Sequence, residues 1–270
     1  MVRRGSIVVI AAFALLLSGC SSGDSTKTMT VEERFAQAKA LFDRGSYLDA
    51  INEFTVLTLQ YQGSTYAADA QYYLGECRLE REEYLLAAFE YAVVKRNYPA
   101  SPRVPDAQYK LAFSYYKLSP KSSLDQQYTK KALDEFQSFV EYYPSHPMAV
   151  EAEARIKELN TRMAKKAYET ARLYTIMEYY RAALFYYDDV IERYHDTEYA
   201  PLAYLDKVDL LISRNRYKDA SVEVNRFMER FPDSVLRRQM ENFKKEIDEV
   251  LKPGSRTSGA STTTPPGTSL

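Results

Sequence analysis

Few side chains in this sequence could carry catalytic or metal chemistry. The chain has 270 residues but only two histidines, His146 and His195, and two cysteines, Cys20 and Cys77. A transition-metal site needs three or four ligands gathered together, so a His-rich or Cys-rich metal centre is excluded. The sequence therefore predicts a protein without a metal, a cofactor or an enzymatic activity. An enzyme such as a peptidoglycan hydrolase is the alternative from another class.

Charge and glycine content exclude two further classes. The 36 basic and 37 acidic side chains leave a formal net charge of −1, whereas proteins that hold nucleic acid carry a marked excess of Lys and Arg. No glycine stands between Gly75 and Gly254, which argues against phosphate-binding loops and tight hairpins. We therefore expect a helical chain with no nucleic-acid partner.

Cys20 is the residue whose neighbours predict a definite chemistry. An apolar segment over residues 7–17 follows two arginines and is too short to span a bilayer, as in a secretory signal. It ends in Leu17-Ser18-Gly19-Cys20, which resembles the bacterial lipobox, in which small residues precede the cysteine that receives the lipid. The sequence predicts a signal peptide over residues 1–19 and a lipid anchor at Cys20. An ordinary signal peptide followed by an incidental cysteine is the alternative.

The residues after Cys20 indicate to which membrane the lipid anchor directs the protein. Two or more acyl chains hold a protein stably on a membrane. Ser21 stands where an aspartate would, by resemblance to enterobacterial lipoproteins, favour the inner membrane. We therefore expect the protein at the outer membrane, lipid-anchored on its periplasmic face. Residues 20–30 are rich in Ser, Gly, Thr and Lys and predict a flexible tether.

A repeat of 37 residues organises the rest of the chain. In four units a tyrosine is followed three residues later by an alanine: Tyr47/Ala50, Tyr84/Ala87, Tyr180/Ala183 and Tyr217/Ala220. A third unit lies between them, with an eight-residue insertion around residues 118–123, and residues 148–163 predict an extra or elongated helix. The prolines are expected between units, because one inside a helix would cost about 3 kcal/mol.

The repeat resembles the tetratricopeptide repeat (TPR) in its order of small and aromatic residues, which is Ala38, Leu41, Gly45, Tyr47, Ala50 and Phe54 in the first unit. At the turn position of Gly45, other units carry Glu82, Glu178 or Asn215. The resemblance implies an all-α fold, an α-solenoid of about five TPR-like helix pairs with a 37-residue period. We expect it over residues 31–252. Residues 253–270, rich in Pro, Thr, Ser and Gly, predict a disordered tail.

Aromatic side chains recur at the same register in the first helices of the first three units. In TPR folds these helices line the concave face that binds peptides. The predicted groove comprises Phe35, Phe42, Tyr72, Glu76, Leu79, Tyr109, Phe113 and Tyr116. Rings and tyrosine hydroxyls would suit an extended peptide or a β-strand rich in aromatics. The alternative is that the rings pack between neighbouring units.

A run of basic residues follows in the long predicted helix. Arg155, Arg162, Lys165 and Lys166 form a candidate surface for docking an acidic partner, which would act through association rate and specificity. A solvated helix face is the alternative. Cys77 is interpreted as a buried, inert thiol, and His146 and His195 as solvent-facing or capping residues.

Together, the lipobox and the five units resemble the BamD family of outer-membrane protein assembly lipoproteins, also known as competence lipoproteins. The more specific segments are 98–102 (YPASP), 133–144 and 154–164. The resemblance implies a subunit that helps deliver unfolded β-barrel precursors and docks on a BamA-like barrel insertase beside other assembly lipoproteins. In that family the N-terminal repeats are associated with substrate and the C-terminal repeats with the insertase. The alternatives are a TolA-associated or cell-division envelope scaffold and a solute-binding lipoprotein.

Overall fold

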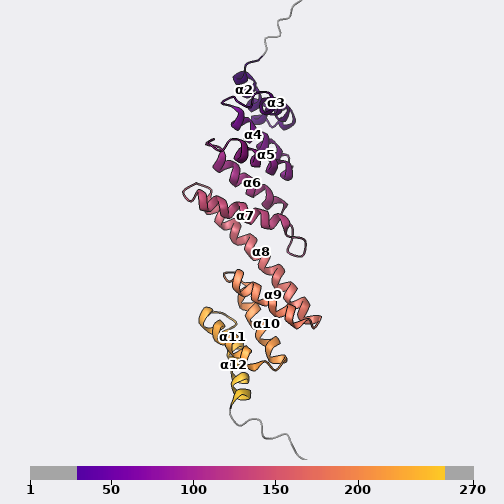
Figure 1. Ribbon diagram of the computed structural model, residues 1–270, viewed down its shortest axis with the longest axis vertical. Coiled ribbons are helices and arrows are strands. Elements are labelled where there is room, and N and C mark those ends of the chain that lie inside the picture. Colours follow the sequence, from indigo (N-terminus) through magenta and orange to yellow (C-terminus); the bar gives the residue numbers. More distant parts are fainter. Residues whose placement is uncertain (1–28, 253–270) are drawn as a thin grey trace, which may run out of the picture.

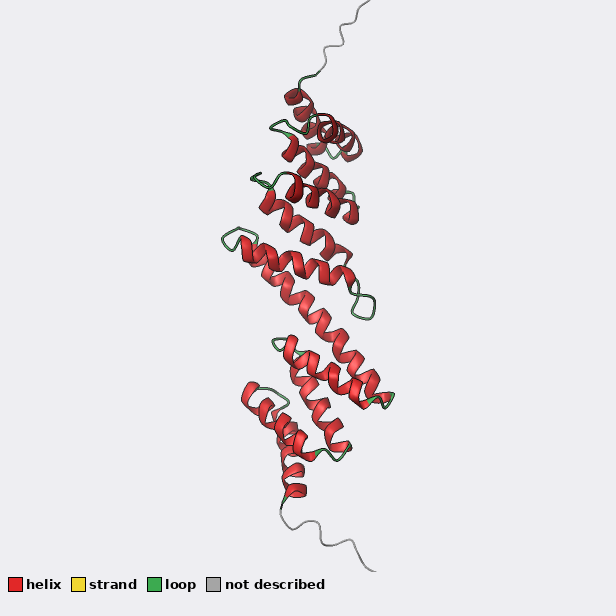
Figure 2. Cartoon of the chain, viewed as in Figure 1, coloured by secondary structure: helices red, strands yellow, loops and turns green. Residues whose placement is uncertain are grey.

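A computed structural model describes residues 29–252, and every regular element among them is an α-helix (Figure 2). The first three helix pairs are α2 (Val31–Asp43) with α3 (Tyr47–Gln60), α4 (Ala67–Glu80) with α5 (Tyr84–Asn97), and α6 (Val104–Leu118) with α7 (Gln127–Tyr142). Two more pairs and a last helix follow: α8 (Ala149–Ile176) with α9 (Tyr180–Arg193), α10 (Tyr199–Ser213) with α11 (Tyr217–Arg230), and α12 (Arg237–Leu251). The pairs stack into an elongated solenoid (Figure 1), so the expected fold class is confirmed.

The second helix of four pairs begins at the repeated tyrosine, as the 37-residue pattern predicts. The turn before it requires one residue with a left-handed backbone: Gly45 has φ 77°, and Glu82, Glu178 and Asn215 have φ 59°, 60° and 56°. In the first unit the Ser46 amide then donates to the Leu41 carbonyl at 2.9 Å, closing the helix end. Three units therefore keep the TPR turn without glycine: asparagine tolerates this backbone, whereas it is unfavourable for the two glutamates.

Small residues let the two helices of each pair approach closely. Ala38, Ala112 and Ala171 in first helices are fully buried, and so are the repeated alanines of the second helices: Ala50, Ala87, Ala132, Ala183 and Ala220. Gly75 holds the corresponding place in α4, against the ring of Tyr91. The predicted close contact between helices is confirmed in all of these units.

Proline placement differs from the expectation at two positions. Pro105 lies in the first turn of α6 and Pro201 in the first turn of α10. The first turn tolerates proline, since its amide has no carbonyl partner inside the helix. The helices therefore begin before these prolines without being interrupted.

The long helix α8 joins two cores. Its first part packs Leu159 and Met163 into a cluster with α6 and α7, whereas its last part packs Ala167, Tyr168 and Ala171 into a cluster with α9, α10 and α11. In the described part of the chain, each strong contact that links α2–α7 with α9–α12 runs through α8. Residues 148–163 thus form an elongated first helix of the fourth unit rather than an extra one.

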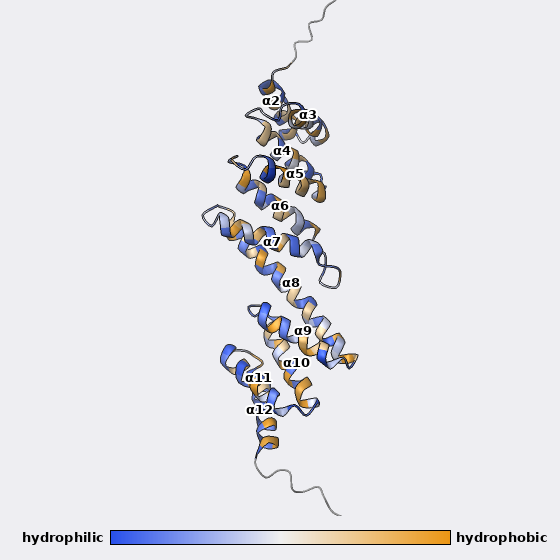
Figure 3. Ribbon diagram, in the orientation of Figure 1, coloured by the Kyte–Doolittle hydropathy of each residue, from blue (hydrophilic) through white to orange (hydrophobic). Residues whose placement is uncertain are grey.

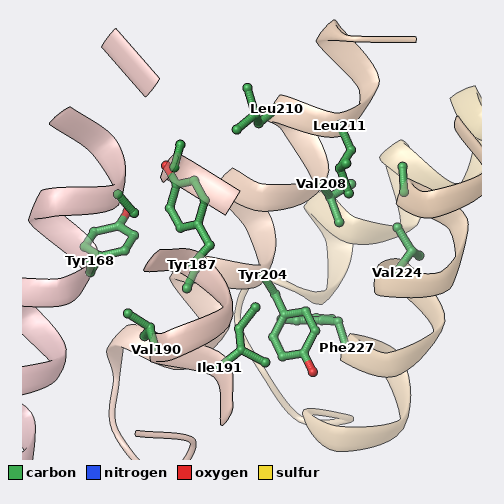
Figure 4. Packing of buried hydrophobic residues seen from close by; sticks show 14 of the residues in the cluster. Tyr168, Tyr187, Val190, Ile191, Tyr204, Val208, Leu210, Leu211, Val224 and Phe227 are labelled. Carbon is green, nitrogen blue, oxygen red and sulfur yellow. The ribbon is translucent and has the colours of Figure 1, made fainter. Parts of the chain in front are cut away.

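The C-terminal core combines aliphatic side chains with four aromatic rings (Figure 4). The rings of Tyr168 and Tyr187 lie 6.3 Å apart, and those of Tyr204 and Phe227 lie 6.0 Å apart. Helix α12 covers the end of this core with Met240 and Ile247, both buried. It follows the fifth pair as a cap with a polar outer face, as terminal helices of solenoids do.

Candidate functional site

The predicted groove residues lie on the first helices of the first three units. Phe35 and Phe42 are on α2, Tyr72, Glu76 and Leu79 on α4, and Tyr109, Phe113 and Tyr116 on α6. Three of these side chains are buried, and the other five are partly exposed. The ladder therefore contains both packing residues and residues that reach the surface.

Tyr72, Leu79 and Tyr109 expose only 8%, 9% and 4% of their surface. The Tyr72 ring lies 5.7 Å from the ring of Tyr91 on α5, and the Tyr109 ring lies 5.5 Å from that of Phe139 on α7. Each ring thus packs against the second helix of its own pair, because burying its area there excludes water. The expectation that these three side chains face an open groove is corrected.

The remaining aromatic groove residues pack on neighbouring rings and stay partly exposed. Phe35 lies 5.0 Å from Tyr66, and Phe42 lies 5.4 Å from Tyr73, measured between ring centroids. Phe113 stacks between Tyr109 at 6.3 Å and Tyr116 at 6.0 Å. This arrangement fixes the rings without hiding them, as a binding surface for apolar side chains requires.

Polar contacts link the second and third units along the same helices. The Glu76 carboxylate accepts from the Tyr91 hydroxyl at 2.5 Å and from Lys110 Nζ at 3.0 Å. Arg103 binds Asp69 at 2.5 Å and lies over the Tyr72 ring at 5.2 Å. Burial, and then the neighbouring Glu76 carboxylate, raise the pKa of Tyr91 far above its ordinary value, so its hydroxyl stays a hydrogen-bond donor.

The four predicted docking residues of α8 bind groups of their own chain. Arg155 donates to the Tyr116 hydroxyl at 2.9 Å, and Arg162 binds the Glu158 carboxylate at 2.9 Å and the Ser119 hydroxyl at 2.6 Å. Lys166 donates to the Leu124 carbonyl at 2.7 Å, and Lys165 lies 3.9 Å from Glu169. Tyr116 and Arg155, expected in separate sites, therefore meet.

The insertion in the third unit forms a loop that hydrogen bonds hold in place. The buried Gln126 amide donates to the Lys121 and Leu124 carbonyls at 2.8 and 2.9 Å. Arg162 and Lys166 hold the loop against α8 from outside. Arg162 and Lys166 therefore stabilise this loop, which accounts for two of the basic residues of α8 without a docking partner.

An exposed apolar patch lies where α8 turns into α9, and the pattern analysis did not identify it. Leu173, Ile176, Met177, Tyr179 and Phe185 expose 54%, 76%, 49%, 58% and 65% of their surface. Figure 3 shows hydrophobic colour at this turn. The spacing of Leu173, Ile176 and Met177 is that of a helix face, which in a sequence resembles a core-facing stripe. We call these five residues the α8–α9 patch.

The two histidines and Cys77 agree with their interpretation. His146 accepts from the Met148 amide at 3.3 Å, at the start of α8, and His195 is exposed. The Cys77 thiol is free and buried, and burial raises its pKa to about 12. Among residues 29–252, no group of three His, Cys, Asp or Glu side chains could hold a metal ion.

Cys20, the signal peptide and the predicted tail lie outside the described residues. Within the described residues, none of the helices combines the length and the apolar character that crossing a bilayer demands.

Comparison with known families finds a match. The model of the YfiO family, described as outer membrane lipoprotein, matches residues 27–210. This range covers α2 to α9 and most of α10. No curated protein matches the chain.

Several solved structures are similar at low identity. The complex of the TPR2AB domain of yeast Sti1 with pHSP90 matches at 15% identity and a TM-score of 0.43, covering 82% of this chain and 83% of that one. A TPR protein of Parabacteroides merdae matches at 15% identity and a TM-score of 0.36, with coverages of 81% and 72%. A TPR protein of Thermus thermophilus matches at 14% identity and a TM-score of 0.34, with coverages of 80% and 100%. At these identities and TM-scores the matches carry no information on function.

Proposed function

The chain belongs to the YfiO family of outer membrane lipoproteins, and on that premise we propose that it is a non-catalytic subunit of the machinery that assembles β-barrel proteins in the outer membrane. In this proposal a lipid on Cys20 anchors the solenoid on the periplasmic face. The N-terminal units recognise unfolded barrel precursors, and the C-terminal units dock on the barrel insertase. The family match over residues 27–210 is the observation that carries the proposal.

The first three units supply the proposed precursor surface. Unfolded barrel precursors present strands in which apolar and polar side chains alternate, with aromatic residues near the strand ends, and their backbone groups are unpaired. Phe35, Phe42, Phe113 and Tyr116 offer ring edges held in place by neighbouring rings. Such rings bind apolar side chains without sequence specificity, as a subunit that handles many precursors requires.

The α8–α9 patch supports docking through the C-terminal half. Large exposed apolar side chains are costly to leave in water, and several of them around one helix turn commonly mark a protein interface. Arg172 on α8 is 61% exposed beside it, and supplies a charged rim of the kind that surrounds interface cores. The patch lies at the far end of α8 from the first three units, so precursor and insertase could be held together.

Purification in native detergent tests the proposal. The full chain with an affinity tag is extracted from outer membranes of its own host, and co-purifying proteins are identified. We expect the β-barrel insertase in stoichiometric amounts. Recovery with cell-wall enzymes alone, as for a cell-division scaffold, would contradict the proposal. A Cys20→Ser chain should leave the membrane fraction, and continued membrane association would refute the anchor.

The precursor surface is tested separately with a peptide from the C-terminal strand of a barrel precursor. The Phe42→Ser/Phe113→Ser chain should bind it at least about tenfold more weakly than the unmodified chain, since two ring contacts are lost. Leu85→Ser/Phe89→Ser is the matched control, because Leu85 and Phe89 are 53% and 58% exposed on α5, a second helix. Equal losses in both chains would contradict the assignment of the surface to the first helices.

A further inference from the structure

A small cavity opens in the seam between α9 and α11, with α10 beneath it. Its volume is about 210 Å³. The apolar side chains on its wall are Leu184, Leu211 and Val222, one from each of the three helices. The other lining side chains are charged: Asp188, Lys207, Arg216, Asp219 and Glu223.

A buried ion triad forms one side of this cavity. Lys207 is only 7% exposed, and its Nζ lies 2.5 Å from Asp188 Oδ1 and 2.9 Å from Glu223 Oε1. The contacts tie α10 to α9 and to α11. Because a buried ammonium must be paired to be tolerated, the triad is part of the packing of the C-terminal half.

The carboxylate of Glu223 is not fully satisfied. Its Oε1 accepts from Lys207 and lies 3.4 Å from Arg226, but its Oε2 is buried and has no hydrogen-bond partner among the described residues. The residue as a whole is 8% exposed. Buried polar atoms in native proteins nearly always have a hydrogen-bond partner. This oxygen therefore indicates that a bound ligand or partner supplies the missing donor.

The other two carboxylates can be reached from outside. The side chains of Asp188 and Asp219 are 50% and 54% exposed, and each has one oxygen bound, by Lys207 and by Arg216. An ionised carboxylate can accept further hydrogen bonds on its second oxygen. The lining contains two cations and three carboxylates, which leaves it with one negative charge in excess.

We propose that this cavity is a socket for a lysine or arginine side chain of a protein partner. The methylene stem would lie on Leu184 and Val222, and the cationic head would donate to Asp188, to Asp219 and to the unpartnered Oε2 of Glu223. Long basic side chains combine an apolar stem with a charged head in this way. Val222 on the wall is 51% exposed, and Phe185, which follows the lining residue Leu184 and holds the same register position in α9, is 65% exposed. An apolar rim around one buried charged anchor is typical of an interface hot spot.

A peptide probe tests the socket without any barrel insertase, so its result is independent of the proposed function. The full chain carrying Cys20→Ser is titrated with acetyl-Gly-Gly-Arg-Gly-Gly-amide while NMR follows the methyl groups of Leu184, Leu211 and Val222. We expect saturable shifts of these methyl groups. The same peptide with citrulline in place of arginine should bind about tenfold more weakly or worse, because it has the shape without the charge.

Two variants and one control complete the test. Asp188→Asn/Asp219→Asn should lose binding, whereas Asp209→Asn/Asp233→Asn, which changes two exposed aspartates outside the cavity, should keep it. Should the first variant lose its helical circular dichroism, Val222→Lys decides instead, because it places a cation of the chain itself at the rim and should block the peptide. Binding that is equal for citrulline and arginine, or that survives Val222→Lys, would overturn the socket.

Discussion

The ring of Tyr91 lies directly against the backbone of Gly75, where the two helices of the second unit cross. A Cβ atom on residue 75 would stand 2.7 Å from Cε1 of the fully buried ring, closer than any real contact. The Tyr91 hydroxyl is also held by Glu76 at 2.5 Å, so the ring is fixed at both ends. The absence of a side chain at this position is therefore a requirement of the packing.

Gly75→Ala should destabilise the protein for this reason. Overpacking of a buried site costs about 1–3 kcal/mol, and the better helix propensity of alanine offsets about 1 kcal/mol of that at most. Urea unfolding measures the change. Gly63→Ala is the matched control, because nothing lies within 4 Å of a Cβ there, and its effect should stay within about 0.5 kcal/mol. An unfolding free energy as high in Gly75→Ala as in the unmodified chain would contradict the packing described.

Glu82→Gly should stabilise the protein. Glu82 has φ 59°, the left-handed backbone that glycine adopts without strain at the same turn in the first unit. We expect a gain of about 1 kcal/mol in the free energy of unfolding, after allowance for the greater freedom of glycine in the unfolded chain. Glu80→Gly, at the last helical residue of α4, should instead bring no gain, because the backbone there is already right-handed. A loss at both positions would show that the Glu82 side chain contributes more than its strained backbone costs.

Tyr109→Ala should unfold the third unit more readily rather than merely weaken peptide binding. Its ring is 4% exposed and packs on Phe136 and Phe139. Removal of a buried aromatic ring costs about 3–5 kcal/mol. Differential scanning calorimetry would show the loss. Unchanged stability of the Tyr109→Ala chain would contradict the burial of this ring and would favour its original assignment to the groove.

Stability should fall in alkaline solution, in part because of Cys77. Burial raises the pKa of this thiol from an ordinary 9.0 to about 12. Between these values the unfolded chain holds fewer protons than the folded chain, so the free energy of unfolding declines as the pH rises above about 9. Urea unfolding measures this decline at pH 8, 9.5 and 10.5. The two chains compared both carry Cys20→Ser, and one of them also carries Cys77→Ala. The Cys77→Ala chain should lose less stability with pH, by up to about 1 kcal/mol per pH unit; parallel slopes would contradict a shifted thiol.

The repeat, the helix starts and the close contacts between helices were predictable from residue types alone. A tyrosine at 47, 84, 180 or 217 begins four of the five second helices, and an alanine three residues later faces the first helix of the pair. Both signals depend on local periodicity, which a sequence carries directly. An uninterrupted helical pattern likewise predicted a helix over residues 148–163, but it left open whether this helix is separate or is the first part of α8.

The direction in which each side chain points was harder to predict from the sequence. Whether Tyr72 or Tyr109 faces a groove or its partner helix depends on how each helix is rotated in the stack, and that is decided by packing across the whole unit. The α8–α9 patch shows the converse, because Ile176 stands in a core-like pattern yet is 76% exposed. Arg155 and Arg162 bind groups of the same chain. The sequence did not reveal this, because their partners Tyr116 and Ser119 lie about forty residues away.

The central claim is that this solenoid docks on the barrel insertase through its C-terminal half. The most direct measurement is the dissociation constant between the Cys20→Ser chain and the periplasmic domain of its host's insertase. We predict saturable binding that weakens at least about tenfold in Ile176→Ser/Phe185→Ser, since two exposed apolar side chains are removed from the interface, and stays unchanged in Leu85→Ser/Phe89→Ser. No binding by the unmodified chain, or an equal loss in both variants, would contradict the claim.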